Sequence, residues 1–220
     1  MCSKLFDENC SNVLDSHRVP NILLKYLNSI TGNGALAIPV VVYGNRNYDD
    51  ALIELKDILE LNGFKVIGGG AFIGEHAFSK ILAKNRPDEE DMDIVSDFAN
   101  QIYTKLITQD KIQTVVITGN NPYRKHYIPK NKDGIAVDIR KVTPKTNSDC
   151  NFCKLCANIC PMGSIDFEDG SKLNGICIKC GACIKKCPMN AKYYDNENYL
   201  IHKQELEVDF VYRKQPELFI

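Results

Sequence analysis

Eight of the ten cysteines in the chain fall into two runs with the same spacing. Each run has the form C-x2-C-x2-C-x3-C-P, and every residue of the second run lies 27 positions after its counterpart in the first. The runs consist of Cys150, Cys153, Cys156, Cys160 and Pro161, and of Cys177, Cys180, Cys183, Cys187 and Pro188. Thiolates are soft ligands for zinc, copper(I) and iron–sulfur clusters. The short, equal spacings indicate that each loop directs several sulfurs towards one point.

Two other kinds of cysteine site fit these runs less well than an iron–sulfur cluster. A structural zinc site uses four ligands, usually from two separated C-x2-C pairs, so three cysteines at this spacing would leave a surplus thiolate at each zinc. A disulfide framework requires an oxidising compartment, and no stretch of the sequence resembles a signal peptide. A cubane [4Fe–4S] cluster needs four thiolates, and three of them can come from one C-x2-C-x2-C loop.

Residues 148–193 resemble the bacterial 2[4Fe–4S] ferredoxins, in which this run occurs twice. The resemblance implies that the fourth cysteine of each run binds the cluster of the other run. It assigns a first cluster to Cys150, Cys153, Cys156 and Cys187, and a second cluster to Cys177, Cys180, Cys183 and Cys160. It also implies a small α+β domain with pseudo-twofold symmetry, short hairpins and one-turn helices, whose function is one-electron transfer.

The composition limits the remaining possibilities. The chain has 220 residues, of which 44% are hydrophobic, enough for one ordinary domain and a small one. A formal charge of −1 argues against nucleic acid as an obligate partner, and no apolar run reaches the length of a membrane span. Cys2 and Cys10 lie outside the runs and are expected to be ordinary thiols. The cysteine usage predicts a cytoplasmic protein.

Before the cysteine runs, the sequence alternates between helical and strand patterns. Helices are expected over residues 20–30, 49–62 and from Pro87 onwards, the first with a buried apolar face and the second capped by Asn47. Apolar runs at residues 35–43 and 64–70 predict buried strands, the latter closing at Gly68-Gly69-Gly70. This order predicts an α/β fold with a parallel sheet.

The expected organisation has five parts. A weakly ordered start at residues 1–19 precedes an α/β domain at 20–109 and a linker at 110–147 that contains one strand, residues 114–118. The ferredoxin domain at 148–193 is followed by a tail at 194–220, expected to form a short helix that packs back on one of the domains.

Five segments of the chain are similar to fused flavodoxin-like/ferredoxin proteins. They are residues 18–21, 43–50, 68–76, 86–90 and 213–219. The resemblance implies that residues 20–108 correspond to the second half of a flavodoxin fold, with strands missing before residue 20. The fold class predicted is therefore α/β, with a partial, truncated flavodoxin-like parallel sheet and a small ferredoxin domain. An exposed apolar edge of such a sheet invites pairing or aggregation. Three explanations are therefore open: another chain completes the sheet, the α/β module is unstable, or the sequence is an incomplete version of a longer protein.

In that family, the loop that corresponds to residues 43–50 flanks a flavin, and Tyr48 matches a tyrosine that stacks on the FMN ring. A flavodoxin also holds the FMN phosphate in a Thr/Ser-rich turn at a helix N-terminus. No such turn precedes Pro20. FMN is therefore a doubtful cofactor, and we expect that the chain does not bind it tightly by itself.

Three functions remain open from the sequence. The first is an electron carrier with two [4Fe–4S] clusters that exchanges single electrons with redox protein partners, rather than a stand-alone enzyme. The second is a flavin and iron–sulfur oxidoreductase component with FMN in the α/β domain. In the third, the α/β domain is only an assembly surface within a larger redox complex.

Overall fold

The structure, a computed structural model, describes residues 18–130 and 134–220. The described residues form two compact units. The α/β unit contains residues 18–75, 83–127 and 212–220, and the cysteine-rich unit contains residues 76–82, 128–130 and 134–211. The weakly ordered start expected at residues 1–19, with Cys2 and Cys10, lies outside the described residues except for its last two positions.

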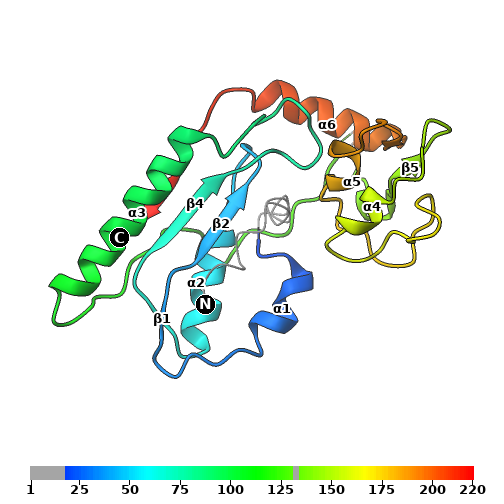
Figure 1. Cartoon of the computed structure of the whole chain (residues 1–220). Helices are drawn as coiled ribbons and strands as arrows, with labels where there is room; N and C mark the ends of the chain where they lie inside the picture. Colours follow the sequence, from blue (N-terminus) through cyan, green and yellow to red (C-terminus); the bar gives the residue numbers. More distant parts are fainter. Residues whose placement is uncertain (1–17, 131–133) are drawn as a thin grey trace. The chain divides into compact units, whose positions relative to one another are not determined.

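Short parallel strands build the α/β unit. Strand β1 (Leu36–Ala37) pairs with β3 (Lys65–Val66), and β2 (Val40–Tyr43) pairs with β4 (Gly69–Ile73), both in parallel. On the other edge of β4 lies β7 (Glu217–Phe219), which runs antiparallel to it (Figure 1). The unit is therefore mixed α/β with a parallel core, as the alternating pattern predicted. The C-terminal strand β7 was not predicted.

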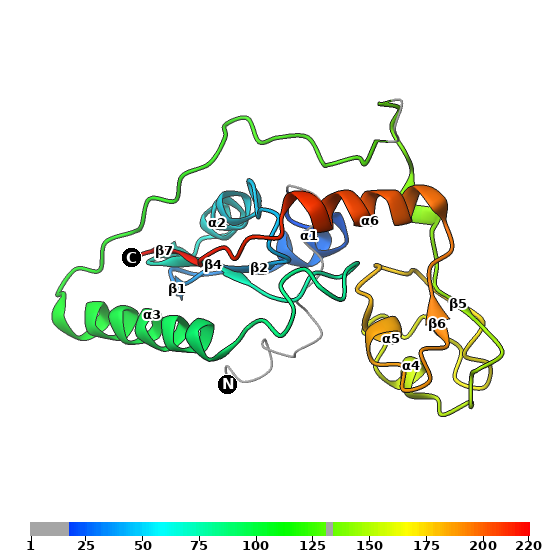
Figure 2. The same cartoon turned by 90° about the horizontal axis from the view of Figure 1, so that it is seen from above.

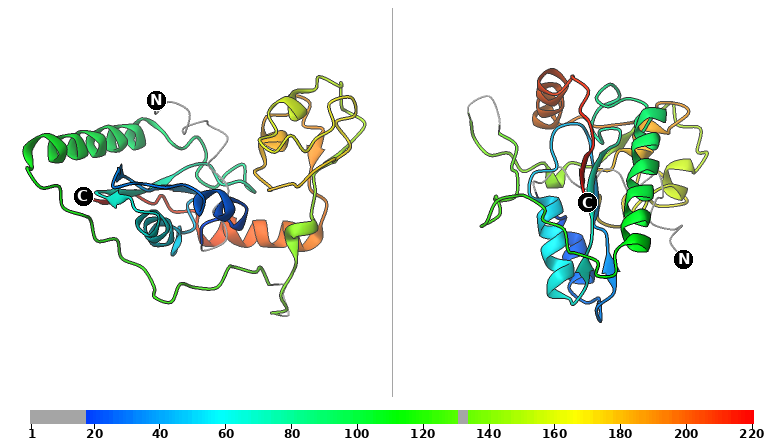
Figure 3. Two further views of the ribbon diagram at one scale, coloured as in Figure 1. Left: turned by 90° about the horizontal axis from the view of Figure 1, so that it is seen from below. Right: turned by 90° about the vertical axis from the view of Figure 1, so that its left-hand side faces the viewer.

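Helices α2 (Ala51–Leu61) and α3 (Glu89–Thr108) cover opposite faces of this sheet (Figures 2 and 3). Successive residues of a strand face opposite sides, and β4 uses both. Ala71 and Ile73 belong to the apolar cluster on the α2 side, whereas Phe72 packs with Phe98 of α3, with ring centroids 5.9 Å apart. Because β4 is buried on both faces, its sequence is a continuous run of apolar residues.

Gly68, just before β4, and Gly69, the first residue of β4, allow neighbouring elements to approach closely. A Cβ atom at Gly68 would lie 2.3 Å from Cδ1 of Ile102 in α3, and one at Gly69 would lie 2.5 Å from Cδ1 of Ile117. The expectation that the triple glycine closes the strand was wrong, since β4 continues to Ile73. These two glycines therefore allow close packing at the start of β4 and do not end a strand.

Three further local expectations need correction. Helix α1 (Asn21–Leu27) forms where expected but has no buried residue, and Leu23 and Tyr26 of its predicted apolar face are exposed. The strand expected at residues 35–43 is split into β1 and β2 around Pro39, because proline cannot donate a ladder hydrogen bond. Helix α2 begins after Asp50 rather than being capped by Asn47, whose Oδ1 accepts from the backbone N–H of Asp49 at 2.9 Å.

The segment after α3 packs on the sheet without becoming a strand. Residues 114–118 contain the buried Val115 and Ile117 of the α2-side core. The backbone N–H of Val115 donates to the carbonyl of Val66 at 3.0 Å, which places the segment beside β3. The predicted strand is therefore an extended edge segment.

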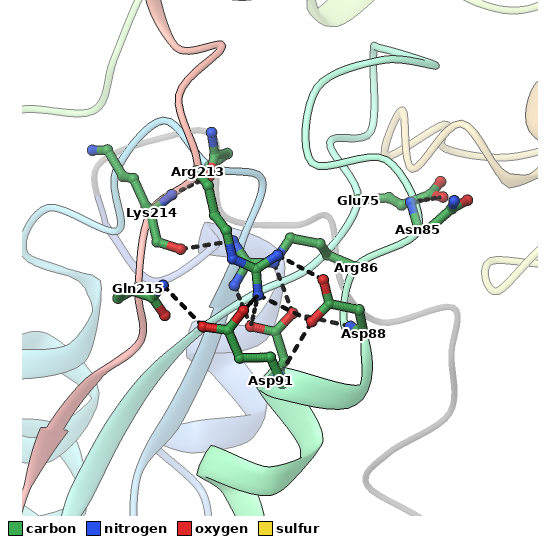
Figure 4. Close-up of polar contacts among 10 residues, drawn as sticks. Glu75, Asn85, Arg86, Asp88, Asp91, Arg213, Lys214 and Gln215 are labelled. Atoms are coloured by element: carbon green, nitrogen blue, oxygen red, sulfur yellow. Dashed lines mark hydrogen bonds and ion pairs between the residues drawn. The ribbon is translucent and has the colours of Figure 1, made fainter.

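A network of charged residues anchors the C-terminal segment to the start of α3 (Figure 4). The buried side chains of Arg86 and Asp91 form an ion pair, and Arg86 Nη1 donates to the carbonyl of Lys214 at 2.7 Å. Arg213 pairs with Asp88 at 2.6 Å, and the two side chains of Asp88 and Asp91 form a capping box for α3. This network precedes β7 directly and holds the segment that reaches the sheet.

Asp50 is expected to make the free energy of unfolding of the α/β unit depend on pH in the acidic range. Burial alone would raise the pKa of this carboxyl, but hydrogen bonds from the backbone N–H of Arg124 (2.7 Å) and from Asn120 (2.8 and 3.1 Å) lower it below its usual value. A lowered pKa in the folded state contributes stability above the unfolded-state pKa, about 4, and this contribution is lost as pH falls through the folded-state value.

We therefore expect the difference in free energy of unfolding between the wild type and Asp50→Asn to shrink as the pH falls below about 4. Chemical denaturation followed by circular dichroism at several pH values measures this difference. Asp97→Asn, an exposed position on α3, is the matched control. A difference that stays constant with pH would contradict the assignment.

The cysteine-rich unit contains η1 (Ile139–Lys141), β5 (Lys145–Thr146), α4 (Leu155–Asn158), α5 (Ala182–Lys185), β6 (Lys192–Tyr193) and α6 (Glu197–Asp209). The tail was expected to form a short helix, and α6 is that helix. Its buried residues Tyr199, His202 and Leu206 lie on one face. Phe78 packs on Tyr199 with ring centroids 4.8 Å apart, and Ser79 Oγ donates to Glu207 at 2.6 Å. Residues 76–82 thus pack against α6.

Among the described residues, no helix has the length and apolar character needed to cross a membrane.

Candidate metal centre

The two cysteine runs fold into the same backbone conformation. The one-turn helices α4 and α5 start 27 residues apart and follow the second cysteine of their runs. Three pairs of residues at the same offset have positive φ, namely Phe152 and Lys179, Lys154 and Gly181, and Gly163 and Asn190. The sequence repeat is therefore also a conformational repeat. It turns each C-x2-C-x2-C stretch into a tight loop that leads into a single helical turn.

The two halves exchange strands with each other. Thr146, before the first run, pairs with Lys192, after the second, and the equivalent bridge joins Leu173 to Ile165. Matching hydrogen bonds flank the two pairs: Asn147 N–H to Ala191 O at 3.0 Å, and Asn174 N–H to Ser164 O at 2.8 Å. This reciprocal exchange is a pseudo-twofold arrangement. It places the end of each run beside the start of the other.

As a consequence, four cysteines line each of two cavities. The first cavity is lined by Cys150, Cys153, Cys156 and Cys187, together with Phe152, Phe167, Met189 and Lys192. The second is lined by Cys160, Cys177, Cys180 and Cys183, together with Ile165, Ile176 and Tyr194. Each cavity takes three cysteines from one run and the fourth from the other. This is the grouping that the ferredoxin resemblance implies.

The cysteines have the chemistry that an iron–sulfur cluster requires. None of the eight is part of a disulfide. In the parts of the chain that the structure describes, no group of three or more Cys, His, Asp and Glu side chains converges closely enough to hold a single metal ion. A cluster needs wider spacing than one ion does, because each thiolate binds a different iron. The residues therefore fit a [4Fe–4S] cluster in each cavity.

Burial favours the protonated thiol at two cysteines of the second cavity, Cys180 and Cys183. It raises the pKa of Cys183 to about 12 and also raises the pKa of Cys180. Because iron binds the thiolate, metal binding at this cavity must release protons. The backbone N–H of Ser164 lies 3.3 Å from Sγ of Cys160, and hydrogen bonds of this kind are one means by which a protein tunes a cluster.

Gly181, in the second run, shows how closely another segment approaches the second cavity. It has a φ of 74°, and a Cβ atom there would lie 2.3 Å from the carbonyl oxygen of Ala77. Its counterpart Lys154 has a φ of 61° and retains a side chain. Glycine is thus needed at position 181 because the loop of residues 76–82 packs against it. Tyr194, which lines the same cavity, packs on Tyr199 with ring centroids 4.4 Å apart.

Tyr48, the residue with a possible role in flavin stacking, lies in the core of the α/β unit. Its side chain is 7% exposed and packs on Tyr43, with ring centroids 5.5 Å apart. Its hydroxyl donates to Glu217 in β7 at 2.6 Å. Burial, followed by this hydrogen bond, raises the pKa of Tyr48 above its usual value. Stacking on a flavin therefore stays a prediction, and it would require Tyr48 to expose its ring.

Sequence reasoning did not identify Lys192 as part of a cavity. Lys192 is 5% exposed and its ammonium group donates to the carbonyl of Gly170 beside the first cavity. The 27-residue offset could have indicated this role, because it aligns Lys192 with Ile165. Both residues, however, lie after the cysteine runs to which the repeat was traced.

Comparison with protein families matches residues 102–205 to a model described as a 4Fe-4S dicluster domain. No curated protein showed a significant match to the chain. The family match contains all eight cysteines of the two runs. The protein is accordingly an electron-transfer protein that carries two [4Fe–4S] clusters and exchanges electrons with redox partners.

Proposed function

We propose that the first cluster is held by Cys150, Cys153, Cys156 and Cys187, and the second by Cys177, Cys180, Cys183 and Cys160. The observation that carries this proposal is the division of these cysteines between two separate cavities. When bound, each cluster supplies a site that accepts and releases one electron. The protein residues contribute thiolates, exclude part of the solvent and keep the two sites within one small unit.

We propose that the protein is a carrier of single electrons between redox proteins. The first cavity offers a natural approach for a partner, because Cys153 and Phe152 at its rim are exposed. The ferredoxin domain is proposed to span residues 148–193, between a linker at 110–147 and the tail. A cytoplasmic location follows from the need to keep eight thiols reduced until iron binds.

The α/β unit supports a second proposal, that residues 20–109 form part of a flavodoxin-like fold. Its parallel strands and its helices on both faces are features of such folds. Among the described strands, β2 pairs on one side only, with β4, so its other edge offers a site where a strand of another chain could complete the sheet. With this partner, the unit would dock redox proteins or assemble into a larger complex.

FMN in the α/β unit is the alternative function. It would convert two-electron transfers into single-electron steps for the clusters. The position of Tyr48 after β2 favours a flavin, whereas its burial and its hydrogen bond to Glu217 oppose stacking. We therefore place the carrier function first.

The deciding experiment is anaerobic purification of the whole chain, with iron, acid-labile sulfide and flavin assayed on one sample. We expect about eight irons and eight sulfides per chain and no flavin. The same iron content with one FMN per chain would favour the oxidoreductase component. About one or two metal ions without sulfide would contradict both functions.

A further inference from the structure

The pseudo-twofold symmetry of the cysteine-rich unit is broken at one buried position. Ile165 lines the second cavity and is 7% exposed, while its counterpart Lys192 lines the first cavity and is 5% exposed. Both residues sit in equivalent antiparallel pairs, opposite Leu173 and Thr146. One cavity therefore contains a buried amine where the other contains a hydrocarbon side chain.

Lys192 is held next to the cysteines of the first cavity through Gly170. Its ammonium group donates to the carbonyl oxygen of Gly170. A Cβ atom built on Gly170 would lie only 3.2 Å from Sγ of Cys156, so this glycine is in contact with that sulfur. The hydrogen bond thus fixes the amine on a residue that contacts one of the four thiols of the first cavity. The charge of Lys192 also acts on Cys183 of the second cavity, where it opposes the effect of burial on the pKa of that thiol.

Within residues 18–130 and 134–220, no carboxylate forms an ion pair with Lys192. In contrast, the half-buried Lys154 and the exposed Lys172 pair with Glu168 and Asp169. A buried charge is strongly unfavourable unless an opposite charge compensates it. Four thiolates around a cluster supply such negative charge, and reduction by one electron increases it.

We infer that Lys192 raises the reduction potential of the cluster in the first cavity relative to that of the cluster in the second. The inference rests on the ligand assignment proposed above. A one-electron donor gives one electron to the protein, which is reduced by that electron while the donor is oxidised. A nearby cation stabilises the added negative charge, and burial limits its screening by solvent. The first electron taken up by the protein therefore resides in the first cavity.

The test is an anaerobic redox titration of the holoprotein with dithionite, in which electron paramagnetic resonance follows the reduced clusters. The variant Cys156→Ala identifies the signal of the second cluster. At a fixed potential, we expect Lys192→Met to decrease the ratio of reduced to oxidised first cluster about tenfold, equivalent to about 59 mV for a one-electron couple. The signal of the second cluster should change less.

Three further variants separate charge from other effects. Lys192→Gln removes the charge but retains an N–H group for Gly170, so it should behave as Lys192→Met does. Lys192→Arg keeps the charge and should stay near the wild type. Lys145→Met removes an exposed lysine from the neighbouring strand β5 and should have little effect, because solvent screens its charge.

Each outcome has a defined meaning. Neutral variants that load about eight irons and titrate like the wild type would overturn the role of Lys192, while leaving the ligand assignment intact. An equal shift in Lys145→Met would also overturn it. If neither neutral variant loads iron while Lys192→Arg does, the residue acts in cluster assembly rather than in setting the potential. Failure of the wild type to hold two clusters would instead refute the proposed function.

Discussion

Replacing Cys156 with alanine is expected to lower the iron content of the anaerobically purified protein from about eight to about four atoms per chain. Cys156 is one of four cysteines that line the first cavity, and it lies against Gly170. A cluster with one thiolate missing loses an iron ligand and, in a small domain, part of the binding energy that holds the loop folded. Iron and acid-labile sulfide assays on the same sample measure the loss.

The matched variants test whether the loss is specific to the first cavity. Cys183→Ala removes the counterpart of Cys156 from the second cavity and should also leave about four irons. Cys10→Ser changes a cysteine outside both runs and should retain about eight. Combining the two alanine substitutions should remove nearly all iron. A Cys156→Ala protein with undiminished iron would contradict the proposed ligand set.

The grouping of the cysteines could be predicted from sequence because it depends on local, repeated geometry. Spacings of two and three residues bring sulfurs together within a single turn, and the 27-residue offset imposes the same turn twice. The presence in each cavity of one cysteine from the other run, in contrast, depends on the strand pairing of Thr146 with Lys192 and of Ile165 with Leu173. Only the resemblance to known ferredoxins indicated that grouping in advance.

The parallel strands could also be predicted, since they appear in the sequence as apolar runs, although only β4 is buried along its whole length. Strand β7 could not, because it has three residues and its pairing partner Gly70 lies far away along the chain. The surroundings of Tyr48 were hidden for the same reason, as they depend on Glu217 in β7. Periodicity placed α1 correctly but failed on burial, because a pattern indicates an apolar face and not what covers it.

Lys192 illustrates a different limit. Sequence alone shows a lysine among other lysines, most of which are exposed in this unit. Its burial arises from the pairing of β6 with β5 and from the hydrogen bond to Gly170. The asymmetry between the two cavities is therefore a property of the folded unit, although the two residues that create it are aligned by the repeat.

The charged network at the start of α3 is expected to contribute strongly to the stability of the α/β unit. Arg86 and Asp91 have side-chain exposures of 4% and 2%, and Arg86 Nε donates to Asp91 Oδ2 at 2.7 Å. The same carboxylate accepts the backbone N–H of Asp88 at 3.0 Å. Asp91 thus closes the helix terminus and neutralises the arginine that binds the carbonyl of Lys214. The N-terminus of α3, the buried side chain of Arg86 and, through Arg86, the C-terminal segment at Lys214 therefore all depend on the carboxylate of Asp91.

Asp91→Ala is therefore expected to lower the free energy of unfolding of the α/β unit by about 3–5 kcal/mol, because Arg86 remains buried without its counter-charge. Urea denaturation of the whole chain, followed by circular dichroism, measures the change. Glu90→Ala is the matched control: Glu90 is the preceding helix residue, 60% exposed, and pairs with Arg213 at 2.9 Å. Removal of this exposed pair should change stability by less than about 1 kcal/mol. Equal losses in the two variants would show that the buried ion pair does not anchor the C-terminal segment.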